Sequence, residues 1–158
     1  MSASAAEPKW PVALLGPFPP YRGGIAHHTA LLARTLLARH AVLGLSFTRL
    51  YPGFLFPGRT QFDAAGAELV PPAAAVQRVV DSVAPHTWVR AARLVTRAGC
   101  RLLIVQWWHP FFAPAVAGIA RLVRRRGVHV VYVCHNVLPH ESSRLDGALA
   151  RLGLGAAE

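Results

Sequence analysis

Residues 11–39 have the sequence PVALLG, PFPPYRGG and IAHHTALLARTLLAR, in that order. The first piece is a short apolar run that ends at glycine and proline, which predicts a buried strand over residues 11–16. The second is a loop rich in helix breakers, and the third has helical spacing over residues 25–39. The apolar stripe of this helix is predicted to hold Ile25, His28, Leu32 and Leu36. A strand, a glycine loop and a helix in this order indicate an α/β domain.

The rest of the chain continues the alternation. Further strands are predicted over residues 41–47, 102–106 and 128–134, and further helices over residues 87–97, 112–126 and from residue 142 onward. This order favours right-handed crossovers and a Rossmann-like parallel sheet with helices on both faces. We therefore expect one α/β domain over residues 11–158, preceded by a flexible N-terminus over residues 1–10.

Some segments carry more specific expectations. Residues 128–134 (VHVVYVC) are almost continuously apolar, which is typical of a parallel strand covered on both faces. Gly127 is predicted to end the helix before it. Residues 49–63 contain aromatics and two Pro-Gly steps, which indicate a packed irregular loop. Residues 64–85 show no clear period, and only a short strand near residues 68–70 is expected there.

The composition is strongly basic. The chain has 17 Lys and Arg against 7 Asp and Glu, a formal net charge of +10, and every basic residue except Lys9 is arginine. Such a surface attracts phosphate-bearing ligands or an anionic membrane, and an ordinary basic surface is the alternative. The sequence contains no known nucleic-acid-binding motif, so we expect no nucleic-acid partner.

The cysteines and the apolar segments bear on location. Cys100 and Cys134 lack a paired spacing, which argues against a disulfide scaffold and suits a reducing compartment. Residues 1–9 lack the pattern of a secretory signal. Residues 102–120 are uncharged and long enough to span a bilayer, but their internal Gln106 and prolines favour strand, loop and helix. We expect a cytoplasmic protein, with peripheral contact at the inner face of a membrane left open.

Ligands of parallel sheets bind beyond the carboxyl ends of the strands, so the residues after each strand are the candidates. After the first strand come Arg22, Gly23 and Gly24. Two glycines let the backbone approach a ligand, and the following helix start favours an anion such as phosphate, to which Arg22 adds a charged contact. The alternative is a glycine-rich turn that binds nothing.

The second candidate end has the sequence QWWHPFFAP over residues 106–114. Aromatic faces there can stack on a sugar or line a cleft, and His109 can donate or accept a hydrogen bond. The alternative is that these aromatics belong to the core, which is favoured for Trp107 and Trp108 taken singly because alternate strand residues point to opposite faces.

The third candidate end has the sequence CHNVLPHE over residues 134–141. His135 could orient a reacting sugar or act near a departing phosphate, with Asn136 beside it. A metal site of Cys134, His135, His140 and Glu141 is an alternative, but the spacing matches no standard zinc motif, and we expect no metal. His140 and Glu141 could also simply cap the next helix.

A cluster of arginines forms the last candidate: Arg121, Arg124, Arg125 and Arg126. Cations at the end of a helix suit its dipole, so a solvated helix end is the favoured interpretation. Contact with a membrane surface is the alternative.

Four blocks of the sequence carry a family resemblance: GPFPPYRGGIAHHTALLARTL, SFTRLYPGFLFPGRTQFD, IVQWWHPFFAP and VVYVCHNVLPHE. On these blocks the chain resembles the N-terminal domain of GT-B type glycosyltransferases of family 4. The GGI loop is common across that family, whereas the second and third blocks look specific to one bacterial branch. The resemblance covers most of residues 11–141.

The resemblance implies a Rossmann-like half that faces a second such half across a cleft. The nucleotide-sugar donor would bind mainly to the second half, and this half would contact a glycan or lipid acceptor. The resemblance places Gly23 and Gly24 near the donor phosphate or acceptor, His135 at the reacting sugar and His109 on the acceptor side. Arg22, Asn136 and Glu141 complete the expected donor- and acceptor-binding set. It further implies retention of anomeric configuration, with no cofactor and no bound metal.

The sequence departs from the family pattern because the residues of a C-terminal domain are absent from it. We therefore expect a fragment, a truncated reading frame or one subunit of a split enzyme, which needs the missing domain as its partner. The chain alone is expected to be inactive as a transferase. The alternative function is a non-catalytic Rossmann-like module that binds an acceptor or an anionic membrane surface.

Overall fold

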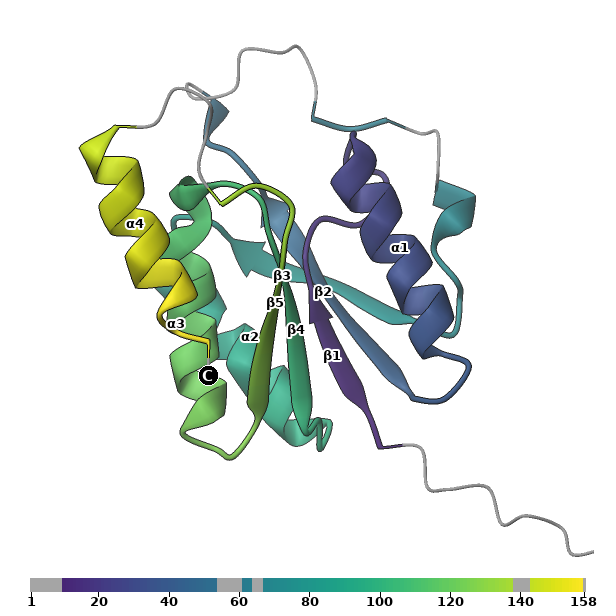
Figure 1. Cartoon of the computed structure of the whole chain (residues 1–158). Coiled ribbons are helices and arrows are strands. Elements are labelled where there is room, and N and C mark those ends of the chain that lie inside the picture. The colour runs from purple at the N-terminus through teal and green to yellow at the C-terminus, as the bar shows by residue number, and fades with distance from the viewer. Residues whose placement is uncertain (1–9, 54–60, 64–66, 138–142, 158) are drawn as a thin grey trace, which may run out of the picture.

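The computed structural model describes residues 10–53, 61–63, 67–137 and 143–157 (Figure 1). Its strands are β1 Val12–Leu15, β2 Val42–Arg49, β3 Ala75–Asp81, β4 Leu102–Trp107 and β5 His129–Cys134. Its α-helices are α1 Gly24–Leu36, α2 Pro85–Arg97, α3 Ala113–Arg124 and α4 Arg144–Leu154. Two short 3-10 helices, η2 Ala67–Leu69 and η3 Pro110–Phe112, lie before β3 and α3.

The strands form one five-stranded parallel sheet in the order β3-β2-β1-β4-β5. Val12 of the central β1 pairs with Val42 on one side and with Leu102 on the other. The chain steps outward from β1 to β3 and then returns to β4, so the strand order reverses between β1 and β4. The predicted Rossmann-like α/β class is confirmed.

Helices cover both faces of the sheet, but unequally (Figure 1). Helix α1 packs over β1 and β2 on one face, while α2, α3 and α4 lie together on the other. All four residues of β1 are buried, because β1 is the central strand. Within the described residues, no helix combines the length and apolarity needed to cross a bilayer.

Strand β5 forms where predicted, but the expectation that both its faces are covered is wrong. It lies at one edge of the sheet, and Val131 is 50% exposed. Val130, which points to the other face, is buried under the three-helix layer. Helix α1 packs on β1 and β2, so it leaves β5 uncovered on that face of the sheet. The apolar run therefore predicts the strand correctly, but it does not predict that one face of this strand is exposed.

The region 64–85 was predicted incorrectly. The expected strand near residues 68–70 is the 3-10 helix η2, and the sequence missed β3 altogether. Strand β3 is the other edge of the sheet, and only Val79 and Val80 of its seven residues are buried. An edge strand with a short buried part does not produce the apolar run or the regular alternation on which strand prediction depends.

Helix α1 forms as predicted, and Leu32 and Leu36 of its predicted stripe pack against the core, but none of the stripe is fully buried. The residues buried against the sheet are small: Ala26, Thr29, Ala30 and Ala33. Small side chains let the helix approach the strands closely, so they displace the larger side chains to the flanks. His28 of the predicted stripe is exposed on such a flank and meets a group from another strand end, described below.

The remaining helices agree with prediction. Helix α2 begins two residues before the predicted start, at Pro85. The predicted helix over 112–126 is divided between η3 and α3, and Gly127 has a φ of 78° at its end, as a helix-terminating glycine requires. Helix α4 starts with a capping box, in which Ser143 and Asp146 satisfy each other's backbone amides.

Candidate functional site

The glycine loop lies at the carboxyl end of β1, next to the reversal in strand order. Gly23 has a φ of 115° and caps the start of α1, a conformation that other residues rarely adopt. A Cβ on Gly24 would meet no atom of the described residues within 4 Å, so that part of the structure leaves the first turn of α1 open. Among the described residues, no side chain caps this helix start. Arg22 is exposed beside it, with its Nε 3.7 Å from a carboxylate oxygen of Asp63.

His135 lies just after β5 and is held by two bonds to the end of β4. Its backbone N–H donates to the carbonyl of Trp107 at 2.8 Å, and its Nε2 lies 2.6 Å from Oε1 of Gln106. An amide oxygen can only accept, so Nε2 carries the proton in this bond and Nδ1 is left as an acceptor. Gln106 is only 1% exposed, so its position is fixed by the core.

A second imidazole lies against His135. The rings of His28 and His135 are 4.8 Å apart between centroids and nearly perpendicular. Burial lowers the pKa of His135, and the positive charge available to His28 lowers it further. His135 is therefore neutral at neutral pH, which suits a hydrogen-bond acceptor or a general base.

Gly16 has no side chain, and this leaves the space that the side chain of Gln106 occupies when it bonds to His135. A Cβ on Gly16 would lie 2.7 Å from Cγ of Gln106 and 3.2 Å from Oγ1 of Thr29. The Nε2 atom of Gln106 is buried and has no hydrogen-bond partner among the described residues. The sequence predicts no site role for Gly16, and it places Gln106 at a candidate strand end without a role. The signal that could have found Gln106 is a polar residue in a strand that is otherwise fully apolar.

His109, predicted on the acceptor side, has a structural partner. Its Nδ1 accepts a hydrogen bond from the backbone N–H of Phe111 at 3.1 Å, so it caps η3. Its charge also contributes to the electrostatics of α4: hydrogen bonds from Ser143 lower the pKa of Asp146, and His109 lowers it further. These contacts place His109 toward α4, whereas His135 meets α1 on the opposite face of the sheet.

The two tryptophans after β4 divide between core and surface. Trp107 is 1% exposed, and its ring packs so closely on Gly153 that a Cβ there could not fit. Trp108 is half-buried and packs on Phe112, with ring centroids 4.3 Å apart. The core alternative therefore holds for Trp107, while Trp108 lines a pocket.

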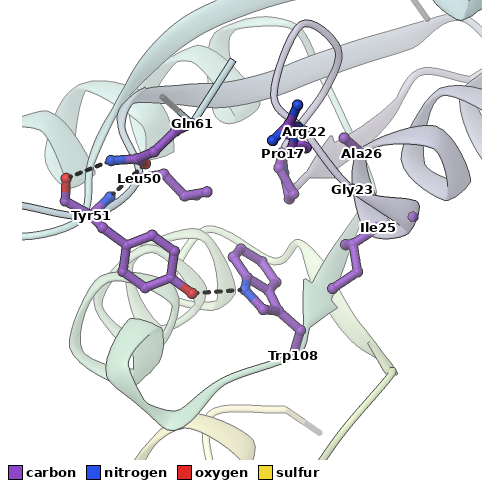
Figure 2. A pocket seen from close by; sticks show the side chains of 10 residues that line it. Pro17, Arg22, Gly23, Ile25, Ala26, Leu50, Tyr51, Gln61 and Trp108 are labelled. Atoms are coloured by element: carbon purple, nitrogen blue, oxygen red, sulfur yellow. Dashed lines mark hydrogen bonds between the residues drawn. The ribbon is translucent and has the colours of Figure 1, made fainter. Parts of the chain in front are cut away.

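That pocket has a volume of about 220 Å³ and lies beside the glycine loop (Figure 2). Besides residues 22–24 of the loop, the side chains that shape it are Pro17, Ile25, Leu50, Tyr51, Gln61 and Trp108. They come from the ends of β1, β2 and β4 and from the start of α1, except Gln61, which lies between β2 and η2. The packed loop predicted over residues 49–63 is confirmed for its described part, which supplies one wall; the site role of Tyr51 and Gln61 was missed.

The other predicted site residues are less constrained. Asn136 is exposed after β5, beside His135. Glu141 and His140 lie outside the described residues. Among the residues that the structure describes, no three or more His, Cys, Asp and Glu side chains are grouped so as to hold a metal ion.

The arginine cluster is not simply a solvated helix end, as the favoured interpretation had it. Arg124 donates to the carbonyls of Ala156 and Ala157, both at 3.2 Å, and Arg121 donates to that of Leu152 at 3.4 Å. These two arginines therefore cap the C-terminal end of α4 from the neighbouring helix.

No protein-family model matches this sequence. No curated protein matches it either.

Proposed function

We propose that this domain is the acceptor-side half of a glycosyltransferase that moves a sugar from a nucleotide-sugar donor to an acceptor. The observation that carries the proposal is the neutral His135 imidazole, fixed by Gln106 at the carboxyl edge of a parallel sheet. Rossmann-like sheets bind ligands at this edge, where the strand order reverses. The resemblance of four sequence blocks to the N-terminal domains of family 4 supports the same reaction.

In this proposal His135 orients the sugar that is transferred. Its Nδ1 accepts a hydrogen bond from a sugar hydroxyl, which holds the ring in a reactive position relative to the departing phosphate. The helix start at Gly23 and Gly24, together with Arg22, offsets the negative charge on that phosphate. Transfer is proposed to retain the anomeric configuration, as the resemblance implies.

The proposal assigns the nucleotide to a second Rossmann-like domain, on a longer form of this chain or on a separate subunit. Two such domains facing each other would close the reaction away from water. The 158-residue chain alone is then expected to bind a substrate without turning it over.

The test is a transfer assay with a panel of radiolabelled nucleotide sugars. The chain is assayed alone and together with the protein encoded by the adjacent reading frame. We expect sugar transfer only in the mixture, and a loss of roughly 100-fold or more in His135→Ala, as is usual for a residue that acts on the reacting group.

The matched control is His129→Ala, which removes a histidine at the opposite end of the same strand β5. It should keep the full rate. Turnover by the chain alone, or equal rates in the two histidine variants, would contradict the proposal. Saturable sugar binding without transfer in any combination would instead favour the non-catalytic binding module.

A further inference from the structure

The pocket of Figure 2 presents apolar faces although several of its residues are polar. The indole N–H of Trp108 is directed to the hydroxyl of Tyr51 at 3.4 Å. The side-chain amide of Gln61 is used twice on the backbone of Tyr51, accepting from its N–H at 3.2 Å and donating to its carbonyl at 3.1 Å. These polar groups are therefore engaged with one another, and the side chains of Tyr51 and Trp108 line the cavity.

Apart from Arg22 and the backbone of Gly23 and Gly24 on the side of the glycine loop, the remaining wall is hydrocarbon. Pro17, Ile25 and Leu50 line the cavity with side chains that cannot form hydrogen bonds. Its volume of about 220 Å³ exceeds the roughly 150 Å³ of an apolar cavity that holds benzene. The pocket thus has the size and a largely apolar lining that suit a short hydrocarbon group, with polar groups only on the side of the glycine loop.

The pocket is also close to the histidine pair. Ile25 and His28 are three residues apart on α1, so their Cβ atoms are neighbours on one helix flank, about 5–6 Å apart. His28 in turn lies against His135. A ligand with its apolar part against Ile25 would therefore place its next polar atoms one helical turn away, beside His135.

We propose that this pocket binds the apolar part of the acceptor, so that the acceptor is an amphiphile with a hydrocarbon group and not a free water-soluble glycan. The word acceptor rests on the proposed function. The pocket's preference for an apolar group does not, because it follows from the lining residues alone.

The test is a chain-length series of alkyl glucosides, from methyl to butyl, hexyl and octyl, added to the 158-residue chain below their micelle concentrations. Binding is followed at the indole ¹⁵N–¹H resonance of Trp108, assigned by its loss in Trp108→Phe. We expect no saturable shift with methyl glucoside. From butyl to octyl, the dissociation constant should fall roughly fourfold for each added methylene that is buried, as the transfer free energy of hydrocarbon predicts.

Two variants separate the pocket from general hydrophobic association. Ile25→Asn places an amide in the pocket wall at a half-buried position, where the fold should tolerate it. It should weaken octyl glucoside binding at least tenfold. Val89→Asn makes the same kind of change on α2, at a residue that is 37% exposed and far from the pocket lining, and should leave binding unchanged.

Affinity that does not depend on chain length, or equal effects of Ile25→Asn and Val89→Asn, would overturn the inference. The outcomes also remain separable from those of the transfer assay, because no donor is present. If the chain binds octyl glucoside but never transfers sugar, the proposed glycosyltransferase function is wrong and the apolar pocket is supported. If the chain transfers sugar to soluble glycans but does not bind alkyl glucosides, the glycosyltransferase function is supported and the apolar pocket is wrong.

Discussion

His135 owes its protonation state to neighbours from two other segments of the chain. Gln106, at the end of β4, accepts the proton on Nε2, and His28 of α1 adds a nearby ring that can carry positive charge. Burial and that charge both disfavour the imidazolium form. The residue that carries the proposed chemistry is thus tuned by a helix and a strand that the sequence separates widely.

Replacing His28 tests this coupling. His28→Gln should raise the pKa of His135, because it removes a charge that opposes protonation, while burial should keep the pKa below its ordinary value of 6.5. The measurement is an NMR titration of the His135 ring Cε1–H. His27→Gln is the control, since His27 does not contribute to the shift and should leave it unchanged. A fall in the pKa, or equal shifts in both variants, would refute the coupling.

The same shift fixes the sign of one pH effect on stability. The folded pKa of His135 lies below 6.5, so the unfolded chain binds the proton first as the pH falls. The contribution of His135 to the free energy of unfolding is therefore complete above pH 6.5, and it is lost as the pH falls from 6.5 toward the pKa of His135 in the folded state. The loss should be smaller in His28→Gln.

Gly16 is the residue whose side chain must stay absent. Gly16→Ala would bring a Cβ within 2.7 Å of Gln106, and such overpacking costs about 1–3 kcal/mol in the free energy of unfolding. It should also displace Gln106 and move the ring resonances of His135. Gly24→Ala is the control, because its Cβ would meet nothing within 4 Å. Urea denaturation of both variants decides the matter: equal stabilities would show that Gly16 is not tightly packed.

At the scale of elements, α4 is held mainly by α3 and η3 rather than by the sheet. Arg124 of α3 donates to two carbonyls just beyond the end of α4 and so ties the two helices together at that end. Guanidinium groups of α3 thus hold the end of α4 in the helix layer, a role that the sequence alone did not predict for the basic cluster.

Arg124→Ala should lower the free energy of unfolding by about 1 kcal/mol, because it removes hydrogen bonds to the end of α4. Hydrogen exchange should increase in α4 before it increases in the central strands. Arg125→Ala is the matched control, since Arg125 is exposed and makes no such bond within the described part of the chain. If the two variants were equally stable, Arg124 would be only a solvated charge.

The elements also show what a single sequence can predict. Strands β1 and β4 were predicted because buried parallel strands are continuous apolar runs. Strand β3 was missed because an edge strand needs no such run, and the coverage of β5 was overestimated because coverage depends on where the helices lie. The buried face of α1 was misplaced because its small residues, not its large ones, allow close approach to the sheet.

For the whole molecule, parallel topology made much of the site predictable. Residues that follow parallel strands must gather at one edge, so Gly23, Gly24 and His135 could be chosen before the fold was known. What could not be predicted depends on register and on loop conformation. Gln106 meets His135 because β4 and β5 pair residue by residue, whereas Gln61 meets Tyr51 outside the sheet, where no strand register sets the contact.

The two hydrogen bonds between the side chain of Gln61 and the backbone of Tyr51 have a consequence for how such a protein can diversify. They fix one wall of the pocket from within a loop, independently of the sheet that holds Gln106 and His135. Substitutions at Leu50 or Tyr51 could reshape the pocket while the imidazole stays in place. A lineage could thus exchange the molecules it recognises without first giving up its chemistry.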